Sequence, residues 1–149
     1  MNQNCNKKLI IFDMEGTVVH EHEPLPWIKS LLELLKKNGL KLAVMTDLDE
    51  IKGKAILTEA GIDSELFDIF VSTTHYDEAF RSAAEKCGAD LSEAVVCSGS
   101  AVGIKIASRC GAYPVAMRTY FAKEFYIKAG AKRVCDDLME LADFLGLEK

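Results

Sequence analysis

Short apolar runs alternate along this chain with longer amphipathic stretches that end in glycine. The runs are "IIFD" (10–13), "LKLAVMT" (40–46), "LFDIFVS" (66–72), "AVVCSG" (94–99) and "AYPVAM" (112–117). They are too short for helices and nearly continuous, as in strands that are covered on both faces. The amphipathic stretches end in "KKNGL", "TEAGI", "EKCGA", "SRCGA" and "IKAGA", where glycine can take the left-handed conformation that closes a helix. The pattern predicts repeated strand–helix units.

Such alternation predicts the fold class. We expect an α/β, three-layer Rossmann-like domain with a mostly parallel sheet and right-handed crossovers, whose ligands bind at the carboxyl ends of the strands. Asp13, Thr46 and the segments 72–74 and 98–100 fall at such ends. Because the chain has no linker, low-complexity tract or charge block, residues 1–149 are expected to form one domain.

Two helix starts also have sequence signals. Thr74 with Asp77 three residues later suggests a capping box, and Asp136 precedes an apolar pattern of helical period that ends at Leu145.

Charge and cysteine usage narrow the function classes. The 149 residues carry a net charge of -5, with acids and bases interspersed, which argues against a nucleic-acid partner. Five cysteines lie far apart without any C-x-x-C pair, as expected for reduced thiols in a cytoplasmic protein. No apolar run approaches the roughly 18 residues of a membrane helix, and the start "MNQNCNKK" does not resemble a signal segment. We therefore expect a cytoplasmic protein with no membrane partner.

The segment "FDMEGTVV" carries the most informative chemistry. Asp13 ends the first apolar run, and Gly16 permits a sharp turn after it. A carboxylate in this place can attack phosphorus and form an aspartyl phosphate, with Glu15 close enough to donate a proton to the leaving group. Asp and Gly are also common turn residues, so a purely structural role for Asp13 is the alternative. Thr46 could hold a phosphate oxygen, or it could cap a helix.

Together these residues resemble the haloacid dehalogenase superfamily, most of whose members are phosphohydrolases, over nearly the whole chain from Leu9 to Leu145. "FDMEGTVV" looks like the family's first motif and "AVMTD" like its second. The resemblance implies Asp13 as nucleophile, Glu15 as general acid and base, and Thr46 with Asp47 as the phosphate-binding pair. It also implies a magnesium site at Asp13 and Glu15, the latter through its backbone carbonyl.

The third and fourth motifs depart from that family. Thr74 and His75 stand where the family has a lysine, and Gly99 and Gly103 stand where it has two carboxylates that bind magnesium. Asp47 could replace a metal ligand, although it reads equally well as an acid at a helix start. Lys105 could supply a cation but reads more simply as a solvated helix residue.

The histidines of "HEHE" (20–23) could bind a transition metal, but we interpret this segment as a mobile polar loop. Only about thirty residues separate Asp13 from Thr46, and the next segment is equally short, so we expect no cap domain and an open site.

Two functions therefore stay open. The first is a phosphohydrolase homologue that acts through Asp13 on a small phosphorylated molecule, with weak or lost activity because the lysine and the magnesium carboxylates are missing. The second is a non-catalytic relative that binds a small anion or a protein partner.

Magnesium should bind weakly or not at all. If Asp13, Glu15 and Asp47 converge, like-charge repulsion should raise the pKa of at least one of them.

Overall fold

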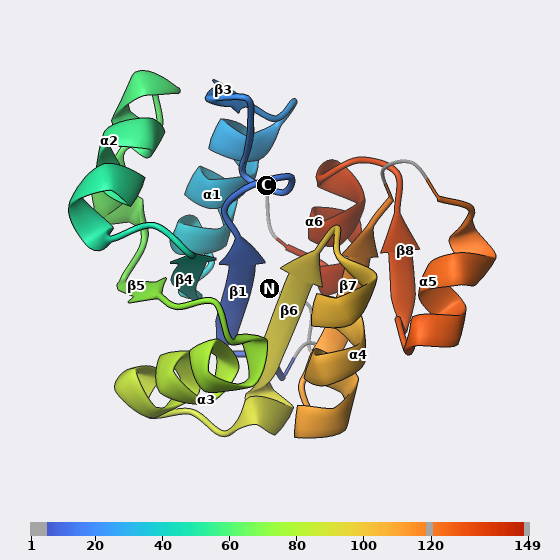
Figure 1. Cartoon of the computed structure of the whole chain (residues 1–149). Helices are drawn as coiled ribbons and strands as arrows, with labels where there is room; N and C mark the ends of the chain where they lie inside the picture. The colour runs from blue at the N-terminus through green and yellow to red at the C-terminus, as the bar shows by residue number, and fades with distance from the viewer. Residues whose placement is uncertain (1–5, 119–120, 148–149) are drawn as a thin grey trace.

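A computed structural model describes residues 6–118 and 121–147 of the chain. Six strands form one sheet in the order β5-β4-β1-β6-β7-β8, and every neighbouring pair in it is parallel (Figure 1). The strands are β1 (Leu9–Asp13), β4 (Lys41–Thr46), β5 (Ile69–Ser72), β6 (Ala94–Ser98), β7 (Tyr113–Met117) and β8 (Arg133–Cys135). The α/β class predicted from the sequence is confirmed.

Helices cover both faces of this sheet. They are α1 (Ile28–Lys37), α2 (Glu50–Glu59), α3 (Tyr76–Cys87), α4 (Ala101–Cys110), α5 (Lys123–Ala129) and α6 (Met139–Leu145), with short 3₁₀ turns at η1 (Ser64–Leu66) and η2 (Leu91–Glu93). Figure 1 shows α1 and α6 on the face opposite α3 and α4. One core cluster joins Phe12 of β1 to leucines of α1 and α6, and a second joins Ile11 to Phe80 of α3. Successive residues of β1 thus enter different cores, which explains its unbroken apolar run.

The predicted helix ends are confirmed at all five glycines. Each has a positive φ, as at Gly88 and Gly111, which directly follow α3 and α4. The predicted start of α3 is wrong in detail, because His75 is the N-cap and its side chain makes no capping hydrogen bond. Ahead of the helix, the Thr73 hydroxyl accepts the His75 N–H at 3.1 Å.

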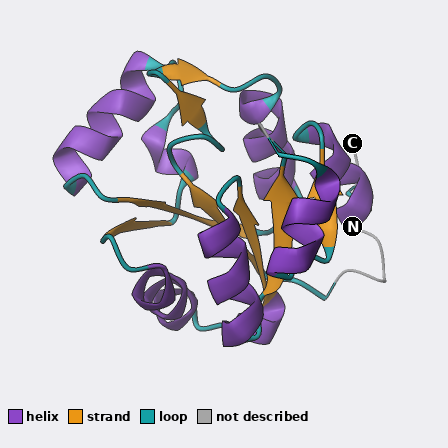
Figure 2. Cartoon of the chain, turned by 45° about the vertical axis from the view of Figure 1, so that its right-hand side comes forward, coloured by secondary structure: helices purple, strands orange, loops and turns teal. Residues whose placement is uncertain are grey.

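A small antiparallel hairpin lies between β1 and α1, formed by β2 (Val19–His20) and β3 (Glu23–Pro24) (Figure 2). This corrects the interpretation of residues 20–23 as a mobile loop. Glu21 and His22 form the turn with positive φ angles of 49° and 65°. The hairpin was missed because two-residue strands are too short to show an alternating pattern.

The described segments between β1, β4 and β5 are short. The hairpin and α1 fill the segment from β1 to β4, and α2 with η1 fills the segment from β4 to β5. Between these described strands the chain is thus no longer than these elements require. Within residues 6–118 and 121–147, no helix has the length and apolar character needed to cross a membrane.

The apolar face of α1 should dominate the stability of the layer it covers. Leu32 is fully buried in the larger core cluster, whereas Leu34 of the same helix is only partly buried. We expect Leu32→Ala to lower the free energy of unfolding by about 2–5 kcal/mol, because it leaves a cavity in a packed core. Leu34→Ala is the matched control and should cost clearly less. Urea unfolding of both variants checks this, and equal losses would contradict the burial described for α1.

Candidate functional site

The site lies where the strand order of the sheet reverses. β1 pairs with β4 on one side and with β6 on the other, and chain connections leave β1 and β6 in opposite directions across the sheet. Such a switch point opens a crevice at the carboxyl ends of the strands. Here it holds an open cavity of about 690 Å³, with Asp13 from β1, Thr46 from β4 and Gly99 after β6 among its lining residues.

Asp13 is the buried carboxyl group of this cavity. Only 9% of the residue is exposed, and Ser98 at the end of β6 donates a hydrogen bond to its Oδ2. The other oxygen, Oδ1, is buried and has no hydrogen-bond partner among the described residues. Burial raises the pKa of Asp13 to about 6, while the Ser98 hydrogen bond acts in the opposite direction. The expected rise in pKa is present, but desolvation rather than like-charge repulsion causes it.

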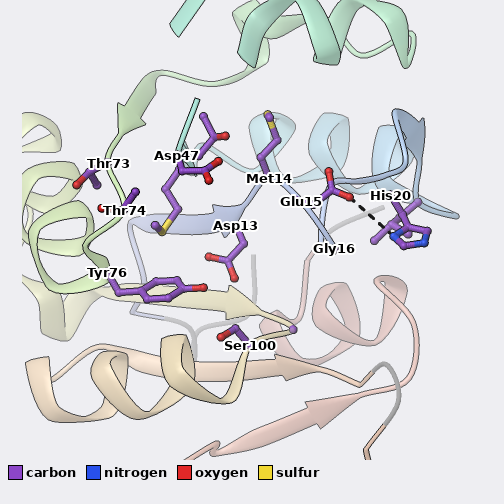
Figure 3. A pocket seen from close by; sticks show the side chains of 14 residues that line it. Asp13, Met14, Glu15, Gly16, His20, Asp47, Thr73, Thr74, Tyr76 and Ser100 are labelled. Atoms are coloured by element: carbon purple, nitrogen blue, oxygen red, sulfur yellow. Dashed lines mark ion pairs between the residues drawn. The ribbon is translucent and has the colours of Figure 1, made fainter. Parts of the chain in front are cut away.

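Glu15 follows Asp13 on the turn at Gly16, whose φ is +86°. Its carboxylate is turned toward the hairpin, with Oε1 3.8 Å from Nδ1 of His20 and 3.3 Å from the backbone nitrogen of Glu21, which donates to it (Figure 3). The Glu15 side chain is 61% exposed. The structure thus places Glu15 at the rim of the cavity, paired with His20 and turned away from Asp13.

Thr46 and Asp47 line the opposite wall. Thr46 is a buried residue, and its hydroxyl accepts a hydrogen bond from the Leu48 N–H at 3.2 Å. Asp47 is exposed at the rim. The alternative role of Asp47, an acid at a helix start, belongs instead to Asp49. Asp49 is the N-cap of α2 and accepts the Lys52 N–H at 2.8 Å. All four predicted site residues, Asp13, Glu15, Thr46 and Asp47, therefore line one cavity.

Tyr76 takes the place beside Asp13 that a cationic side chain would suit. Thr74 lines the cavity but carries no charge, and the ring of Tyr76 lies next to the Asp13 carboxyl group (Figure 3). Burial and the nearby negative charge of Asp13 raise the pKa of Tyr76, while a hydrogen bond with Ser100 lowers it. A tyrosine kept neutral in this way cannot offset negative charge on Asp13 or on a ligand.

Ser98 and Gly103 fit together as a pair. A Cβ atom added at Gly103 would lie 2.9 Å from Oγ of Ser98 and 3.0 Å from Cε1 of Tyr76. The Ser98 hydroxyl therefore occupies space that a carboxylate at position 103 would need. Gly99 differs, because it is not among the glycines with positive φ, and its carbonyl accepts a 3.3 Å hydrogen bond from the Tyr126 hydroxyl.

These residues do not fit a magnesium ion. Among the described residues, no group of three or more His, Cys, Asp or Glu side chains is placed to hold a metal. Magnesium needs near-octahedral oxygen ligands, and with glycine at 99 and 103 the Asp13 carboxylate and the carbonyl of residue 15 supply too few.

The lining is acidic and, in the described part of the chain, contains no lysine or arginine. Lys105 does not line the cavity, since it is exposed on α4. His20 is the one imidazole of the lining, and it faces Glu15. The cavity therefore offers negative charge without a fixed cation.

Two residues that shape the site were missed by sequence reasoning. The sequence places Ser98 only within the segment 98–100 at a strand end, because its contact with Asp13 spans 85 positions and leaves no local signal. The sequence does not single out Tyr76. In the family that this sequence resembles, glycine stands at position 98 and aspartate at position 99. The Ser98 and Gly99 found here were the available sequence signal for the pair of Ser98 and Gly103.

Two curated proteins are similar to this chain in sequence. Protein SUPPRESSOR OF QUENCHING 1, chloroplastic, of Arabidopsis thaliana is 29% identical over 119 residues, which cover 76% of this chain and 11% of that protein. The phosphoglycolate phosphatase of Rhodospirillum rubrum is 27% identical over 126 residues, which cover 81% and 52%. The chain thus spans about half or less of the length of these relatives. No family model matches it.

Solved structures match the fold over nearly the whole chain. A predicted phosphoglycolate phosphatase from Haemophilus somnus has a TM-score of 0.80 at 17% identity, covering 93% of this chain and 98% of that one. A haloacid dehalogenase family hydrolase from Deinococcus radiodurans, with bound phosphate and sodium, has 0.80 at 15%, covering 95% and 96%. A haloacid dehalogenase-like hydrolase from Streptococcus pneumoniae has 0.81 at 12%, covering 93% and 98%. The fold expected from the sequence resemblance is confirmed.

The buried Asp13 should make stability depend on pH. Because its pKa rises from 3.8 to about 6 on folding, the folded state binds the proton more tightly, and stability falls as pH rises from about 4 to about 6. This difference corresponds to about 3 kcal/mol at neutral pH. Asp13→Asn should therefore gain up to about 3 kcal/mol relative to the parent chain between pH 4 and pH 7, measured by urea unfolding.

The control is Asp77→Asn, which removes one exposed carboxylate from the first turn of α3 and so matches the change in net charge. A stability difference between Asp13→Asn and the parent that stays constant from pH 4 to pH 7 would show that Asp13 is not desolvated as described.

Magnesium should bind weakly if at all, for lack of oxygen ligands. Calorimetric titration with magnesium chloride should show no affinity in the submillimolar range. A submillimolar affinity that disappears on Asp13→Asn would reveal a ligand that the described geometry lacks, and Asp47→Asn would be the first variant to test for it.

Proposed function

We propose that this chain, which has the haloacid dehalogenase-like fold, is a phosphohydrolase homologue whose phosphoryl-transfer activity through Asp13 is weak or lost. The fold and the position of Asp13 at the end of β1 support the descent from an aspartyl-phosphate enzyme. Glu15 as general acid and base, and Thr46 with Asp47 as phosphate contacts, belong to this proposal. A cytoplasmic location also belongs to it and is supported by the free thiols of the four described cysteines.

One observation carries the proposal: Asp13 is held by a neutral hydroxyl and faces a cavity without a fixed cation. Ser98 donates to Oδ2, and no described lining residue is lysine or arginine. A carboxylate that approaches a phosphate group meets repulsion of about 4 kcal/mol per pair of unit charges at 4 Å and an effective dielectric constant near 20. No lysine or arginine in the described lining offsets this repulsion.

The size of the catalytic deficit follows from the chemistry of the substrate class. Phosphate monoesters are among the slowest to hydrolyse, and their enzymes supply accelerations of up to about 10²¹-fold. Loss of one electrostatic stabiliser typically lowers the rate about 100- to 1,000-fold, and metal assistance contributes several kcal/mol more. A site without either kind of cation should therefore turn over too slowly to be useful.

A second function, binding without catalysis, is supported by the state of the cavity. It stays open at about 690 Å³, and the buried Oδ1 of Asp13 has no partner among the described residues. A small molecule or a protein partner that enters this cavity would lie against Asp13, whose buried Oδ1 could accept a hydrogen bond after local adjustment. Binding of a small anion, the ligand class considered from the sequence, would need a cationic group that the described lining lacks.

Restoring the missing groups tests the proposal directly. We expect the combination Ser98→Gly, Gly99→Asp, Gly103→Asp and Thr74→Lys to hydrolyse p-nitrophenyl phosphate in a magnesium-dependent way, and Asp13→Asn to abolish this activity. Ser98→Gly is part of the set because its hydroxyl would otherwise crowd the new carboxylate at position 103. All changes are combined because groups that act as one unit are strongly non-additive.

The control is the same variant with Ser98 kept. It should melt at a lower temperature, since overpacking in this place costs about 1–3 kcal/mol, and it should be less active. Parent chain and Asp13→Asn should be equally inactive. A parent chain with substantial Asp13-dependent turnover would overturn the proposal, and a folded restored variant without activity would show that other groups are needed.

A further inference from the structure

We propose that the cavity at Asp13 binds a primary alkylammonium ion, with the ammonium group against Asp13 and the alkyl chain against the apolar wall. This deepens the second function, binding without catalysis, and rests on the proposed loss of phosphoryl transfer. Three independent observations converge on this class of ligand: the sign of the charge, an unsatisfied acceptor and the apolar character of the remaining wall.

The charge of the lining selects a cation. Asp13 is a buried carboxyl group, Glu15 and Asp47 are acidic side chains at the rim, and the described lining has no lysine or arginine. His20 does not reverse this sign, because it lies 3.8 Å from Glu15. A cavity with acidic groups and low-dielectric walls concentrates cations and repels anions.

The unsatisfied oxygen of Asp13 could accept a hydrogen bond from a ligand. Oδ2 has Ser98 as donor, whereas Oδ1 is buried and has no partner among the described residues. A buried acceptor without a donor is unfavourable, and a charged N–H group forms the stronger kind of hydrogen bond with a carboxylate. The Tyr76 ring lies beside Asp13 and is only partly buried.

The rest of the wall suits an alkyl chain. Leu25 and Met45 are apolar residues of the lining, and methionine adapts its shape to an irregular partner. The face of Tyr76 can also attract a cation that passes it. A hydrated magnesium ion would use none of these surfaces, and a phosphate group would lie next to carboxylates without a counter-charge.

Titration of the full chain with n-butylammonium chloride tests the proposal. Chemical-shift changes measured by NMR should map to Asp13, Tyr76 and Met45, with saturation in the millimolar range or below. n-Butyltrimethylammonium is the matched probe, because it keeps the charge and the chain but has no N–H donor. It should bind about tenfold more weakly, which is the value of a charge-assisted hydrogen bond. Inorganic phosphate should produce no saturable shifts in the cavity.

Variants assign the binding to the cavity. Asp13→Asn should weaken n-butylammonium binding about tenfold or more, and Asp47→Asn, an exposed rim change that leaves the fold intact, should weaken it less. Asp77→Asn removes one exposed carboxylate that does not line the cavity and should leave binding unchanged. Equal effects of Asp13→Asn and Asp77→Asn, equal binding of the two ammonium probes, or preferred binding of phosphate would each overturn the proposal.

Failure of this inference can be told apart from failure of the proposed function. A parent chain that neither hydrolyses p-nitrophenyl phosphate nor binds n-butylammonium would refute the alkylammonium site alone. Asp13-dependent hydrolysis in the parent chain would refute the proposed loss of activity, and with it the basis of the inference.

Discussion

The hydrogen bond from Ser98 to Asp13 joins the ends of β6 and β1, the two strands that flank the reversal of strand order. A carboxyl group at this depth loses most of its hydration, and its ionised form then needs donors or cations from the protein. Ser98 is the donor that the described residues supply. The glycine at position 103 follows from this choice, because a Cβ atom there would crowd the Ser98 hydroxyl. Asp13 is thus held by a neutral hydroxyl group, whereas phosphoryl transfer would be served by a cation in this place.

The fold could be predicted because its signals are local and repeated. Five glycines close helices, and each buried strand is a short apolar run, so the order of elements can be read along the chain. β8 and the hairpin of β2 and β3 gave no such signal, since strands of two or three residues show no period. The start of α3 was predicted one residue too early, because Thr74 is a common capping residue whereas the observed N-cap, His75, makes no capping hydrogen bond with its side chain.

The site was predictable in place but less so in detail. Asp13, Glu15, Thr46 and Asp47 follow strands whose carboxyl ends meet, so sequence position alone brings them to one cavity. The direction in which Glu15 points depends on the unexpected hairpin, which sets His20 beside it. The cause of the raised pKa of Asp13 also depends on long-range packing, because burial by distant segments has no sequence signal near residue 13.

The fold and the chemistry of the site rest on different residues here. The large core cluster is built from side chains of β1, β4, α1 and α6, and the second from β1, α3 and α4, and neither cluster includes Asp13 or Ser98. Removing a cluster of metal-binding carboxylates from the end of a sheet relieves like-charge repulsion, so it need not lower stability and can raise it. In the proposed descent from a phosphatase, loss of the lysine would have no such benefit, because a buried aspartate then lacks a counter-charge. Burial raises the pKa of Asp13, so a hydrogen-bond donor from a ligand would stabilise its ionised form.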